Sequence, residues 1–347
     1  MIINRIIDED TQQIIDENNG LTELFNTTVL ITGATGMIGS YFVYTLMKLN
    51  EDYRANIKII PLIRNLKKLP EEVISKNYIF PIVQDVTEKI NYENDVDYII
   101  HAASPASPKI MKEKPVETNF ANTIGTANTL SFAKEHNTKK YLFISSREIY
   151  GAPLENQEYF TEKSFGIVDQ LIPRNAYAEG KKAAENMCVG FKQEYGLDTK
   201  IVRLAHTYGP GMSIYDGRVQ ADFLKNLFNE ENIVLNSDGS SIRTYTYISD
   251  AISAMFKIIL KSSEQVYNVS DEQNEVSIRE LAETMVKIIP EKNLKLVFNI
   301  EEEDKDAGYA PFKFGLLSSE KIRKELGWNA KYSVFEGFKR TLEFLKI

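Results

Sequence analysis

A tyrosine and a lysine four residues apart, Tyr177 and Lys181, are the residues whose types and spacing indicate chemistry most directly. On a helix, positions i and i+4 share a face, so both side chains can reach one bound molecule. A lysine in that position is expected to lower the pKa of the phenol through its charge. The tyrosine could then accept a proton from a hydroxyl while a nicotinamide accepts the hydride from the same carbon. Without further context, the spacing equally fits an exposed lysine on an ordinary amphipathic helix.

A glycine-rich segment far upstream, TGATGMIG at 32–39, indicates where a nicotinamide cofactor would bind. It lies between a predicted strand and a predicted helix, as the dinucleotide-binding pattern requires. Gly33 permits a tight turn, Gly36 lets the pyrophosphate approach the backbone, and Gly39 allows the helix to pack closely on the strand. The positive end of the helix dipole then faces the phosphates. The other cofactor contacts expected in this segment are Thr35, Met37 and Ile38.

The residues at the end of the second predicted strand leave open whether the cofactor is NAD or NADP. A carboxylate that binds the ribose 2′-hydroxyl is expected about 20 residues after the glycines. The chain has Arg64 there instead, followed by Lys67 and Lys68. A missing acid and a nearby cation favour a 2′-phosphate, hence NADP; alternatively, Arg64 is solvated or stacks on the adenine. Asp85, after the third predicted strand, either contacts the adenine or caps a turn.

Three polar residues at the end of the predicted strand 139–146 are candidates for a catalytic group beside Tyr177. Strand carboxyl ends face the ligand crevice of a doubly wound sheet, so Ser146 either binds the hydroxyl that Tyr177 deprotonates or only caps a turn. Glu148 could remove or return the proton on the carbon next to a newly formed ketone, or it pairs with Arg147 on the surface. Arg147 could instead hold a substrate carboxylate.

Two residues further along the chain extend the candidate site. Arg243 offers the forked donor that suits a diphosphate. His206 is a weaker candidate, because a lone histidine is more often structural than catalytic. The three histidines and the single cysteine, Cys188, lack the spacing of a metal site, and no Ser/His/Asp nucleophile pattern is present, so no metal is predicted. We expect Cys188 to be buried and to serve only in packing.

The bulk properties bound the partners and the location of the protein. The chain has 347 residues, 43% of them hydrophobic and 26% charged, which is ordinary globular composition. Its net charge of −8 argues against nucleic acid or an anionic membrane as the main partner. No apolar run approaches membrane-spanning length, and the acidic N-terminus does not resemble a signal peptide. With a single cysteine, these features indicate the cytoplasm.

The order of the predicted elements indicates an α/β fold. Apolar strands are predicted at 27–33, 57–65, 78–86, 96–104, 139–146 and 199–210, and they alternate with helices such as 115–136. That alternation predicts a doubly wound parallel sheet of the Rossmann type, covered on both faces. Beyond about residue 210 the elements become shorter, which indicates a smaller mixed α/β lobe. Before residue 27, an extra helix or two would have an apolar face of Ile2, Ile3, Ile6, Ile7, Ile14 and Ile15, with a turn at Asn19-Gly20.

With these motifs in order, the chain resembles the extended short-chain dehydrogenases/reductases, in particular the NAD-dependent nucleotide-sugar epimerase/dehydratase family. The resemblance runs from about Thr27 to the C-terminus, and residues 1–26 fall outside it. It rests on TGATGMIG, HAAS, NFANTIGTANTL, SSREIYG, YAEGK, RLAHTYGPG, DGRV, RTYTYISD and LGW. Within the family, HAASPASP, PRNAYAEGKK and DGRV look most similar to UDP-glucuronate decarboxylases.

The resemblance implies a role for each candidate. Tyr177 would be the catalytic base, Lys181 would bind the nicotinamide ribose, and Ser146 would bind the C4 hydroxyl. Glu148 would handle the C5 proton, and Arg243 would lie at the diphosphate and near C6. Asn122 would orient helix and site. The remaining candidates are Val86, Ala102 and Ala103 for the cofactor and Ser104, Arg147, His206 and Arg218 for the substrate. The resemblance favours NAD, whereas Arg64 favours NADP.

Two departures from the family pattern decide which reaction is favoured. Family decarboxylases usually have serine at the position of Arg147, and 4,6-dehydratases have aspartate there. A guanidinium cannot act as the acid that expels a hydroxyl, which counts against a 4,6-dehydratase. Decarboxylases also tend to have asparagine at the position of His206. Simple 4-epimerases usually lack the glutamate of Glu148.

The sequence therefore predicts an enzyme that oxidises C4 of a nucleotide-diphosphate hexose and then acts at C5, best matched by a UDP-glucuronate decarboxylase. Dehydration and epimerisation remain alternatives, as does a nucleotide-sensing binding protein, although such a protein would be expected to lose Tyr177 or Lys181. We divide the chain into a helical extension (1–26), a dinucleotide-binding domain (27–210) and a mainly nucleotide-sugar-binding lobe (211–347), with strands that can cross between lobes. The resemblance further implies a homodimer formed through helices 115–136 and 177–195.

Overall fold

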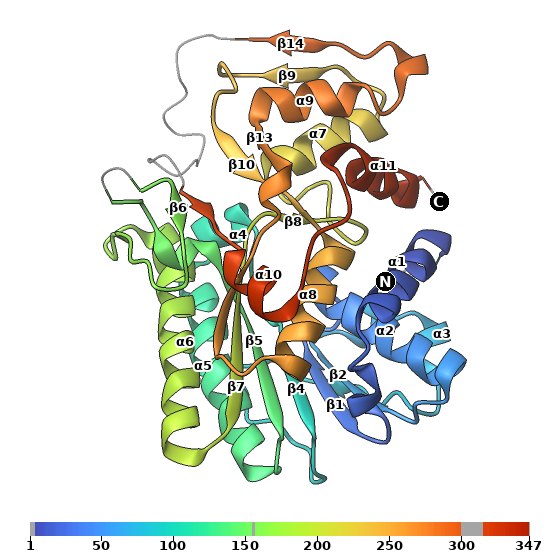
Figure 1. The fold of residues 1–347 in the computed structure, drawn as a ribbon, viewed down its shortest axis with the longest axis vertical. Coiled ribbons are helices and arrows are strands. Elements are labelled where there is room, and N and C mark those ends of the chain that lie inside the picture. The colour runs from blue at the N-terminus through green and yellow to red at the C-terminus, as the bar shows by residue number, and fades with distance from the viewer. Residues whose placement is uncertain (1–3, 155–156, 300–314, 347) are drawn as a thin grey trace.

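The computed structural model describes residues 4–154, 157–299 and 315–346. Within them, seven strands form one parallel sheet in the order β12-β7-β5-β4-β1-β2-β3. Helices cover both faces of the sheet, and a smaller group of helices and short strands lies above it in Figure 1. The predicted α/β fold with a doubly wound parallel sheet is confirmed.

The central strands are β1 (Thr28–Thr32), β2 (Lys58–Ile63), β4 (Tyr98–His101), β5 (Lys140–Ser146) and β7 (Asp198–Leu204). They are buried almost throughout because both faces of the sheet are covered, which explains their continuous apolar sequences. The strands run parallel in register, so Thr32 lies beside His101 and His101 beside Phe143. The carboxyl ends of β1, β4 and β5 therefore meet at one edge of the sheet.

The two outer strands differ from the sequence prediction. The strand predicted at 78–86 is limited to β3 (Ile82–Val83), with an isolated bridge between Ile79 and Ile59. Pro81 lies between these contacts and has no N–H to donate to a ladder, which confines the pairing to a short edge strand. At the opposite edge, β12 (Val266–Val269) pairs with β7 although no strand was predicted there.

Two pairs of helices cover the sheet, each with its own apolar core. On one face, α2 (Met37–Tyr53) and α8 (Ile248–Lys261) pack together within the larger core. On the other face, α5 (Pro115–Glu135) and α6 (Ala176–Tyr195) form the most extensive helix pair of the protein. Cys188 of α6 is fully buried in this second core, as predicted.

The smaller lobe is built from short elements. Its helices are α7 (Val219–Phe228), α9 (Ile278–Val286) and α11 (Val334–Leu345). Its strand pairs are β9 (Ile233–Leu235) with β14 (Leu296–Phe298) and β10 (Ile242–Thr244) with β13 (Glu275–Ser277). The remaining short elements are α3 (Glu71–Ile74), α4 (Pro108–Glu113), α10 (Glu320–Leu326), β6 (Tyr159–Phe160) with β15 (Leu316–Leu317), and β8 (Thr207–Tyr208) with β11 (Thr246–Tyr247).

The N-terminal extension contains a helix, α1 (Arg5–Glu17), and a short 3-10 helix at Leu21–Leu24, separated by the predicted turn at Asn19-Gly20. Helix α1 packs against α2, α8 and α11, so it contacts both parts of the protein (Figure 1). Its buried apolar residues are Ile6, Ile7 and Ile14, with Ile15 partly buried. Ile2 and Ile3 lie outside the described residues.

A buried polar contact holds α1 in place. The Asp10 carboxylate accepts hydrogen bonds from the hydroxyls of Tyr41, at 2.6 Å, and Tyr247, at 2.9 Å. The same carboxylate forms an ion pair with Arg340 of α11, at 2.7 Å. Burial raises the pKa of Asp10, and the charge of Arg340 opposes that rise. These partners join the extension to α2, to the segment before α8 and to α11.

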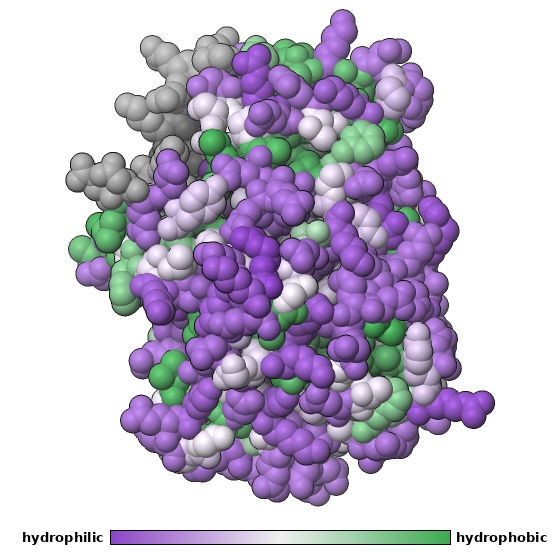
Figure 2. All heavy atoms as spheres, in the orientation of Figure 1, coloured by the Kyte–Doolittle hydropathy of each residue, from purple (hydrophilic) through white to green (hydrophobic). Residues whose placement is uncertain are grey.

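The face in Figure 2 is mostly hydrophilic, with apolar residues in separate groups. Among the described helices, none has the length and apolar character needed to cross a bilayer.

Candidate active site

The candidate site lies where the carboxyl end of β5 meets the first turns of α6. Both Tyr177 and Lys181 belong to α6 and are buried against the sheet. The Lys181 ammonium donates a hydrogen bond of 2.6 Å to the backbone carbonyl of Ile144 and lies 5.8 Å from the centre of the Tyr177 ring. The two residues therefore share one helix face, one turn apart, at the strand end where a ligand would bind.

The expectation that Lys181 lowers the pKa of Tyr177 is wrong for the protein chain itself. Burial raises the pKa of Tyr177 to about 12, the charge of Glu148 acts in the same direction, and a hydrogen bond with Ser146 opposes it. Lys181 instead directs its ammonium at Ile144. Burial also lowers the pKa of Lys181 to about 7, although the charge of Glu185 opposes this. Burial therefore outweighs the neighbouring charges at both residues.

Ser146 has two contacts in the site. It is the last residue of β5, and its hydroxyl accepts a hydrogen bond of 3.2 Å from the backbone N–H of Glu148. This contact begins the short 3-10 helix Arg147–Tyr150. The same side chain lies near the Tyr177 phenol and acts to lower its pKa. Ser146 thus caps a turn, which was the alternative role considered for it, and also lies next to the phenol of Tyr177.

The partner of Glu148 is an arginine that the sequence reading did not single out. The Glu148 carboxylate contacts Arg174 through two nitrogen–oxygen pairs, at 3.3 and 3.4 Å. The sequence reading had paired Glu148 with Arg147 on the surface, and that alternative is wrong. Arg174 stands in the PRNAYAEGKK motif, three residues before Tyr177, so its position was visible in the sequence. Its contact with Glu148 was not, because 26 residues separate the two.

Arg147 is buried rather than solvated. Its guanidinium donates a hydrogen bond of 3.3 Å to the backbone carbonyl of Gly315. Burial lowers the pKa of Arg147 to about 10, while the charge of Glu148 acts in the opposite direction. The side chain therefore remains a cation at neutral pH, in a position next to the candidate base.

His206 lies among three arginines. Its pKa is far below the usual value, first because of burial and then because of the charges of Arg147, Arg243 and Arg218. Its Nδ1 is buried and has no hydrogen-bond partner within the described residues. A neutral imidazole surrounded by guanidinium groups marks a local region of positive charge in an acidic protein, which suits an anionic ligand.

Arg218 and Arg243 come from the smaller lobe. Arg218 precedes α7, pairs with Asp216 and donates to the backbone carbonyl of Ala106, which follows β4. Arg243 lies in β10 and donates to the backbone carbonyl of Ile242 at 2.7 Å. Arg218 thus links the smaller lobe to the strand end of the larger one.

Ser104, Ala103 and Asn122 lie next to the same strand end. The Ser104 hydroxyl donates a hydrogen bond of 2.8 Å to Asn122, whose side chain donates to the carbonyl of Thr118. Asn122 is fully buried in α5, so it can fix the loop after β4. The backbone N–H of Ala103 donates to the hydroxyl of Thr32 at 3.1 Å. The predicted neighbours of cofactor and substrate therefore form one connected group.

His101 contacts the residues around Thr32 through both ring nitrogens, a role that the sequence did not predict. Its two ring nitrogens contact the hydroxyls of Thr32, at 2.8 Å, and Thr126, at 3.1 Å. Burial and the charge of Lys181 lower the pKa of His101 to about 3, so the ring is neutral. The signal was its place in the HAAS motif, directly before Ala102 and Ala103.

The glycine segment fits a dinucleotide. Gly33 has a φ of 65°, and a Cβ there would lie 2.9 Å from the backbone of Ala102 and Ala103. A Cβ on Gly39 would lie 2.3 Å from the carbonyl oxygen of Gly33, so only glycine lets α2 begin this close to β1. Gly36 is the N-cap of α2 and is exposed. The helix N-terminus is therefore accessible to a pyrophosphate. Thr35, Met37 and Ile38 are partly exposed around it.

The predicted adenine end is more open. The Arg64 side chain is 76% exposed and lies 3.9 Å from the Asp85 carboxylate. Asp85 accepts hydrogen bonds from the N–H and hydroxyl of Thr87, at 2.9 and 2.8 Å, so it caps a turn. Val86 is buried beneath this turn. A surface pair of this kind contributes little to stability, so Arg64 is available to a ligand at little cost.

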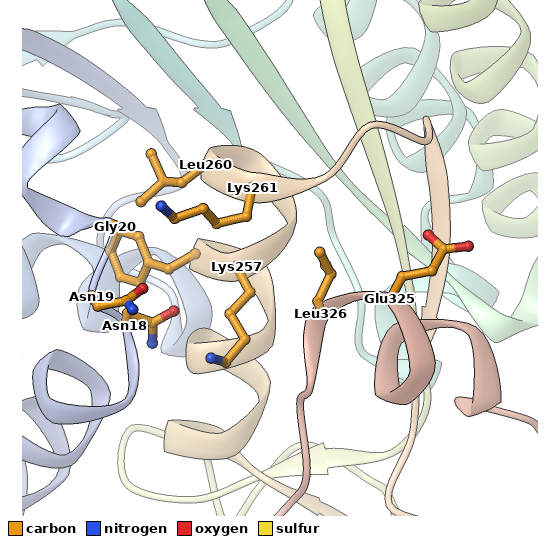
Figure 3. A pocket seen from close by; sticks show the side chains of 9 residues that line it. Asn18, Asn19, Gly20, Lys257, Leu260, Lys261, Glu325 and Leu326 are labelled. Atoms are coloured by element: carbon orange, nitrogen blue, oxygen red, sulfur yellow. The ribbon is translucent and has the colours of Figure 1, made fainter.

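A separate pocket of about 330 Å³ lies elsewhere on the protein, between the end of α1, α8 and α10. Figure 3 shows Lys257 and Lys261 of α8 on one side and Leu326 of α10 on the other. The residues that line it are Asn18, Asn19, Gly20, Phe256, Lys257, Leu260, Lys261, Glu325 and Leu326. None of the candidate site residues belongs to this set. Over the described ranges, no group of histidine, cysteine and acidic residues could hold a metal ion.

Comparisons with known proteins agree with this geometry. Residues 29–270 match the NAD dependent epimerase/dehydratase family. The chain is 33% identical to UDP-glucuronic acid decarboxylase 6 of Arabidopsis thaliana over 315 residues, which are 90% of this chain and 87% of that protein. It is 29% identical to UDP-glucuronic acid decarboxylase 1 of Xenopus tropicalis, over 94% of this chain and 74% of that protein.

Among solved structures, the UDP-glucose 4-epimerase of Thermotoga maritima superposes with a TM-score of 0.75 at 23% identity, over 92% of this chain and 98% of that one. At that identity the likeness establishes the fold alone.

The parallel sheet, the glycine segment before α2 and the Tyr177–Lys181 pair on α6 define a dinucleotide-dependent enzyme. The chain belongs to the NAD-dependent epimerase/dehydratase family. The predicted family and the prediction of an enzyme are thereby confirmed, and NAD is confirmed as the cofactor of the family.

Gly39→Ala is expected to weaken NAD binding about tenfold or more and to cost about 1–3 kcal/mol of stability, because its Cβ would meet backbone atoms. Gly190→Ala is the matched control. Gly190 also lies within a helix, but a Cβ there would meet nothing within 4 Å. That change is expected to raise stability by about 0.5–1 kcal/mol and to leave binding unchanged. Titration calorimetry and urea unfolding measure both, and equal NAD affinity in the two variants would contradict the role of Gly39.

Lys181→Met is expected to change the pH dependence of stability. Since the pKa of Lys181 is about 7 when folded and 10.5 in its ordinary state, the unfolded chain holds a proton that the folded chain lacks between these values. Wild-type stability therefore gains from this group as pH rises through that range. The stability of Lys181→Met relative to wild type is expected to fall from pH 7 towards 10.5, measured by urea midpoints. Lys182→Met, a more exposed neighbour, is the control, and a pH-independent difference for Lys181→Met would refute the assignment.

Proposed function

We propose that this protein oxidises C4 of a nucleotide-diphosphate hexose and then acts at C5, with the decarboxylation of UDP-glucuronate as its reaction. The observation that carries the proposal is the convergence of Tyr177, Ser146 and Glu148 at the end of β5, beside a group of arginines. The family membership and the 33% identity to a UDP-glucuronic acid decarboxylase support it.

The first step is the oxidation at C4. Ser146 and Tyr177, which are close enough for Ser146 to act on the pKa of the phenol, would bind the C4 hydroxyl between them. Tyr177 would take the hydroxyl proton as general base. A bound NAD supplies the hydride acceptor and a positive nicotinamide charge, which favours the phenolate of Tyr177. Lys181, one turn along α6, would hold the nicotinamide ribose.

The second step uses the ketone formed at C4. The bond between C5 and C6 breaks, carbon dioxide leaves, and the electron pair moves onto the C4 oxygen as an enolate. C5 then takes a proton, for which Glu148 is the candidate carrier. Return of the hydride to C4 and of the proton from Tyr177 to the C4 oxygen completes a cycle without net oxidation.

The arginines suit the two anionic parts of such a substrate. Arg243 and Arg218, from the smaller lobe, are candidates for the diphosphate because guanidinium groups bind phosphate oxygens with two donors. Arg147 is buried next to Glu148 and is the candidate for the C6 carboxylate. His206 would lie between them as a neutral donor or acceptor. Release of the carboxylate as carbon dioxide removes one negative charge from this region.

The alternatives differ in what they require of Arg147 and Tyr177. A 4,6-dehydratase needs an acid to expel the C6 hydroxyl, and Arg147 stays a cation at neutral pH. An epimerase that acts at C5 would use Glu148 without breaking a carbon–carbon bond, and one that acts at C4 would not need Glu148. A nucleotide-sensing protein would not need the phenol of Tyr177. Each alternative therefore has a different product or none.

The test is mass spectrometry of the products formed from a panel of nucleotide sugars, each with NAD or NADP. Loss of carbon dioxide from UDP-glucuronate is the expected result, and Tyr177→Phe is expected to abolish it. Loss of water from a hexose would favour the dehydratase, and unchanged mass with a new retention time would favour an epimerase. Absence of turnover with every sugar, with a biological activity that survives Tyr177→Phe, would favour the sensor.

We also propose that two copies of the chain pair through α5 and α6. The exposed side of α5 has Val116, Phe120 and Ile124 at every fourth position, and Val189 is exposed on α6. Such a stripe on adjacent helices suits a second copy of the same surface.

Phe120→Glu is expected to convert a dimer into a monomer in sedimentation velocity, because it places charges in the centre of the proposed interface. Phe298→Glu, at an exposed phenylalanine of β14 in the smaller lobe, is the matched control and is expected to leave the dimer intact. A wild-type monomer at all concentrations would contradict the proposal.

A further inference from the structure

Arg174 lies next to Glu148 in the candidate site, and residues close to it in the sequence do not predict this contact. It lies in the short 3-10 helix Pro173–Asn175, directly before α6 and three residues before Tyr177. The segment that positions the phenol of Tyr177 at the strand end therefore also positions the guanidinium of Arg174. The Arg174 and Glu148 side chains are 20% and 22% exposed, so both are largely removed from water.

The contact between Arg174 and Glu148 has two parallel parts. One guanidinium nitrogen lies 3.3 Å from one carboxylate oxygen, and the other nitrogen lies 3.4 Å from the second oxygen. A two-point contact fixes the plane of a carboxylate as well as its position. The backbone N–H of Glu148 is held at the same time by Ser146. Glu148 is thus fixed at its main chain from β5 and at its carboxylate from the start of α6.

We infer that Arg174 is the positioning residue that holds Glu148 at the C5 position of the substrate. The inference rests on the proposed function. It assigns Arg174 no bond to the reacting atoms. Its effect is on the transfer of one proton between the Glu148 carboxylate and C5, during which the electron pair of the C5 bond moves to or from the C4 carbonyl as an enolate.

Two further observations support a role beyond packing. The Nε donor of Arg174 is buried and has no hydrogen-bond partner within the described residues, so packing alone leaves this polar group unsatisfied. The charges of Glu148 and Arg174 act on Arg147 in opposite directions, which places Glu148 in the fields of two guanidinium groups. Loss of Arg174 would leave Glu148 free to turn towards Arg147.

The experiment separates the two half-reactions in a single turnover in deuterium oxide. The appearance of reduced nicotinamide reports oxidation at C4, and mass spectrometry reports deuterium at C5 of the product. Arg174→Met is expected to keep C4 oxidation within about threefold of wild type and to slow the C5 step by about 10- to 100-fold, since general base catalysis by a positioned group contributes about 10²–10⁴-fold. Arg174→Lys keeps the charge without the two-point contact and is expected to recover only part of the loss.

Two controls make the result specific. Arg323→Met removes a comparably exposed arginine–glutamate pair, with Glu272, at α10, and is expected to change neither step. In the Glu148→Gln background, Arg174→Met is expected to cost nothing further, because a positioning residue acts only through the group that it holds.

The outcomes distinguish the inference from the function beneath it. Equal slowing of C4 oxidation and the C5 step by Arg174→Met, or additive losses in the double variant, would show that Arg174 only supports the fold around Tyr177 and would overturn the inference. A wild-type rate at C5 in Arg174→Met would overturn it as well. If the wild-type enzyme oxidises C4 but never exchanges hydrogen at C5, the proposed function fails, and the inference fails with it.

Discussion

The packing of α6 against the end of β5 is the constraint on which the candidate site depends. The hydrogen bond from Lys181 to the carbonyl of Ile144 fixes the helix two residues before the strand ends at Ser146. Because Tyr177 lies one turn earlier on the same helix face, its phenol comes to the hydroxyl of Ser146. Arg174 precedes that turn and reaches Glu148. One contact between helix and strand thus sets the positions of the groups that we propose for proton transfer at C4 and C5.

Burial determines the charges in this site. It makes His101 and His206 neutral, keeps the phenol of Tyr177 protonated, and lowers the pKa of Lys181 to about 7. Arg147 remains a cation because the ordinary pKa of a guanidinium is high enough to tolerate the loss of water. The result is a localised cationic region in a chain of net charge −8, and it suits a ligand that brings its own negative charges.

The sequence was sufficient to predict those elements for which the local residue pattern and the chemistry indicate the same structure. The glycine segment, the helix with Tyr177 and Lys181, and the five central strands follow from spacing and apolar runs. Long-range contacts were not predictable in this way. The pair of Arg174 and Glu148 joins residues 26 positions apart, and β12 becomes a sheet strand only because β7 offers an open edge. The pKa of Tyr177 was misjudged because burial of the phenol, which residue spacing does not reveal, raises it, and the Lys181 ammonium is directed at the carbonyl of Ile144.

The oxidation at C4 is tested most directly with UDP-glucuronate that carries deuterium at C4. The enzyme is denatured during the first turnover, and the mass of the reduced nicotinamide dinucleotide is measured. The proposed mechanism predicts that the reduced dinucleotide carries the deuterium and that the label returns to C4 of the pentose product. Label that never leaves C4 while carbon dioxide is released would contradict oxidation at C4, and with it the catalytic role assigned to Tyr177.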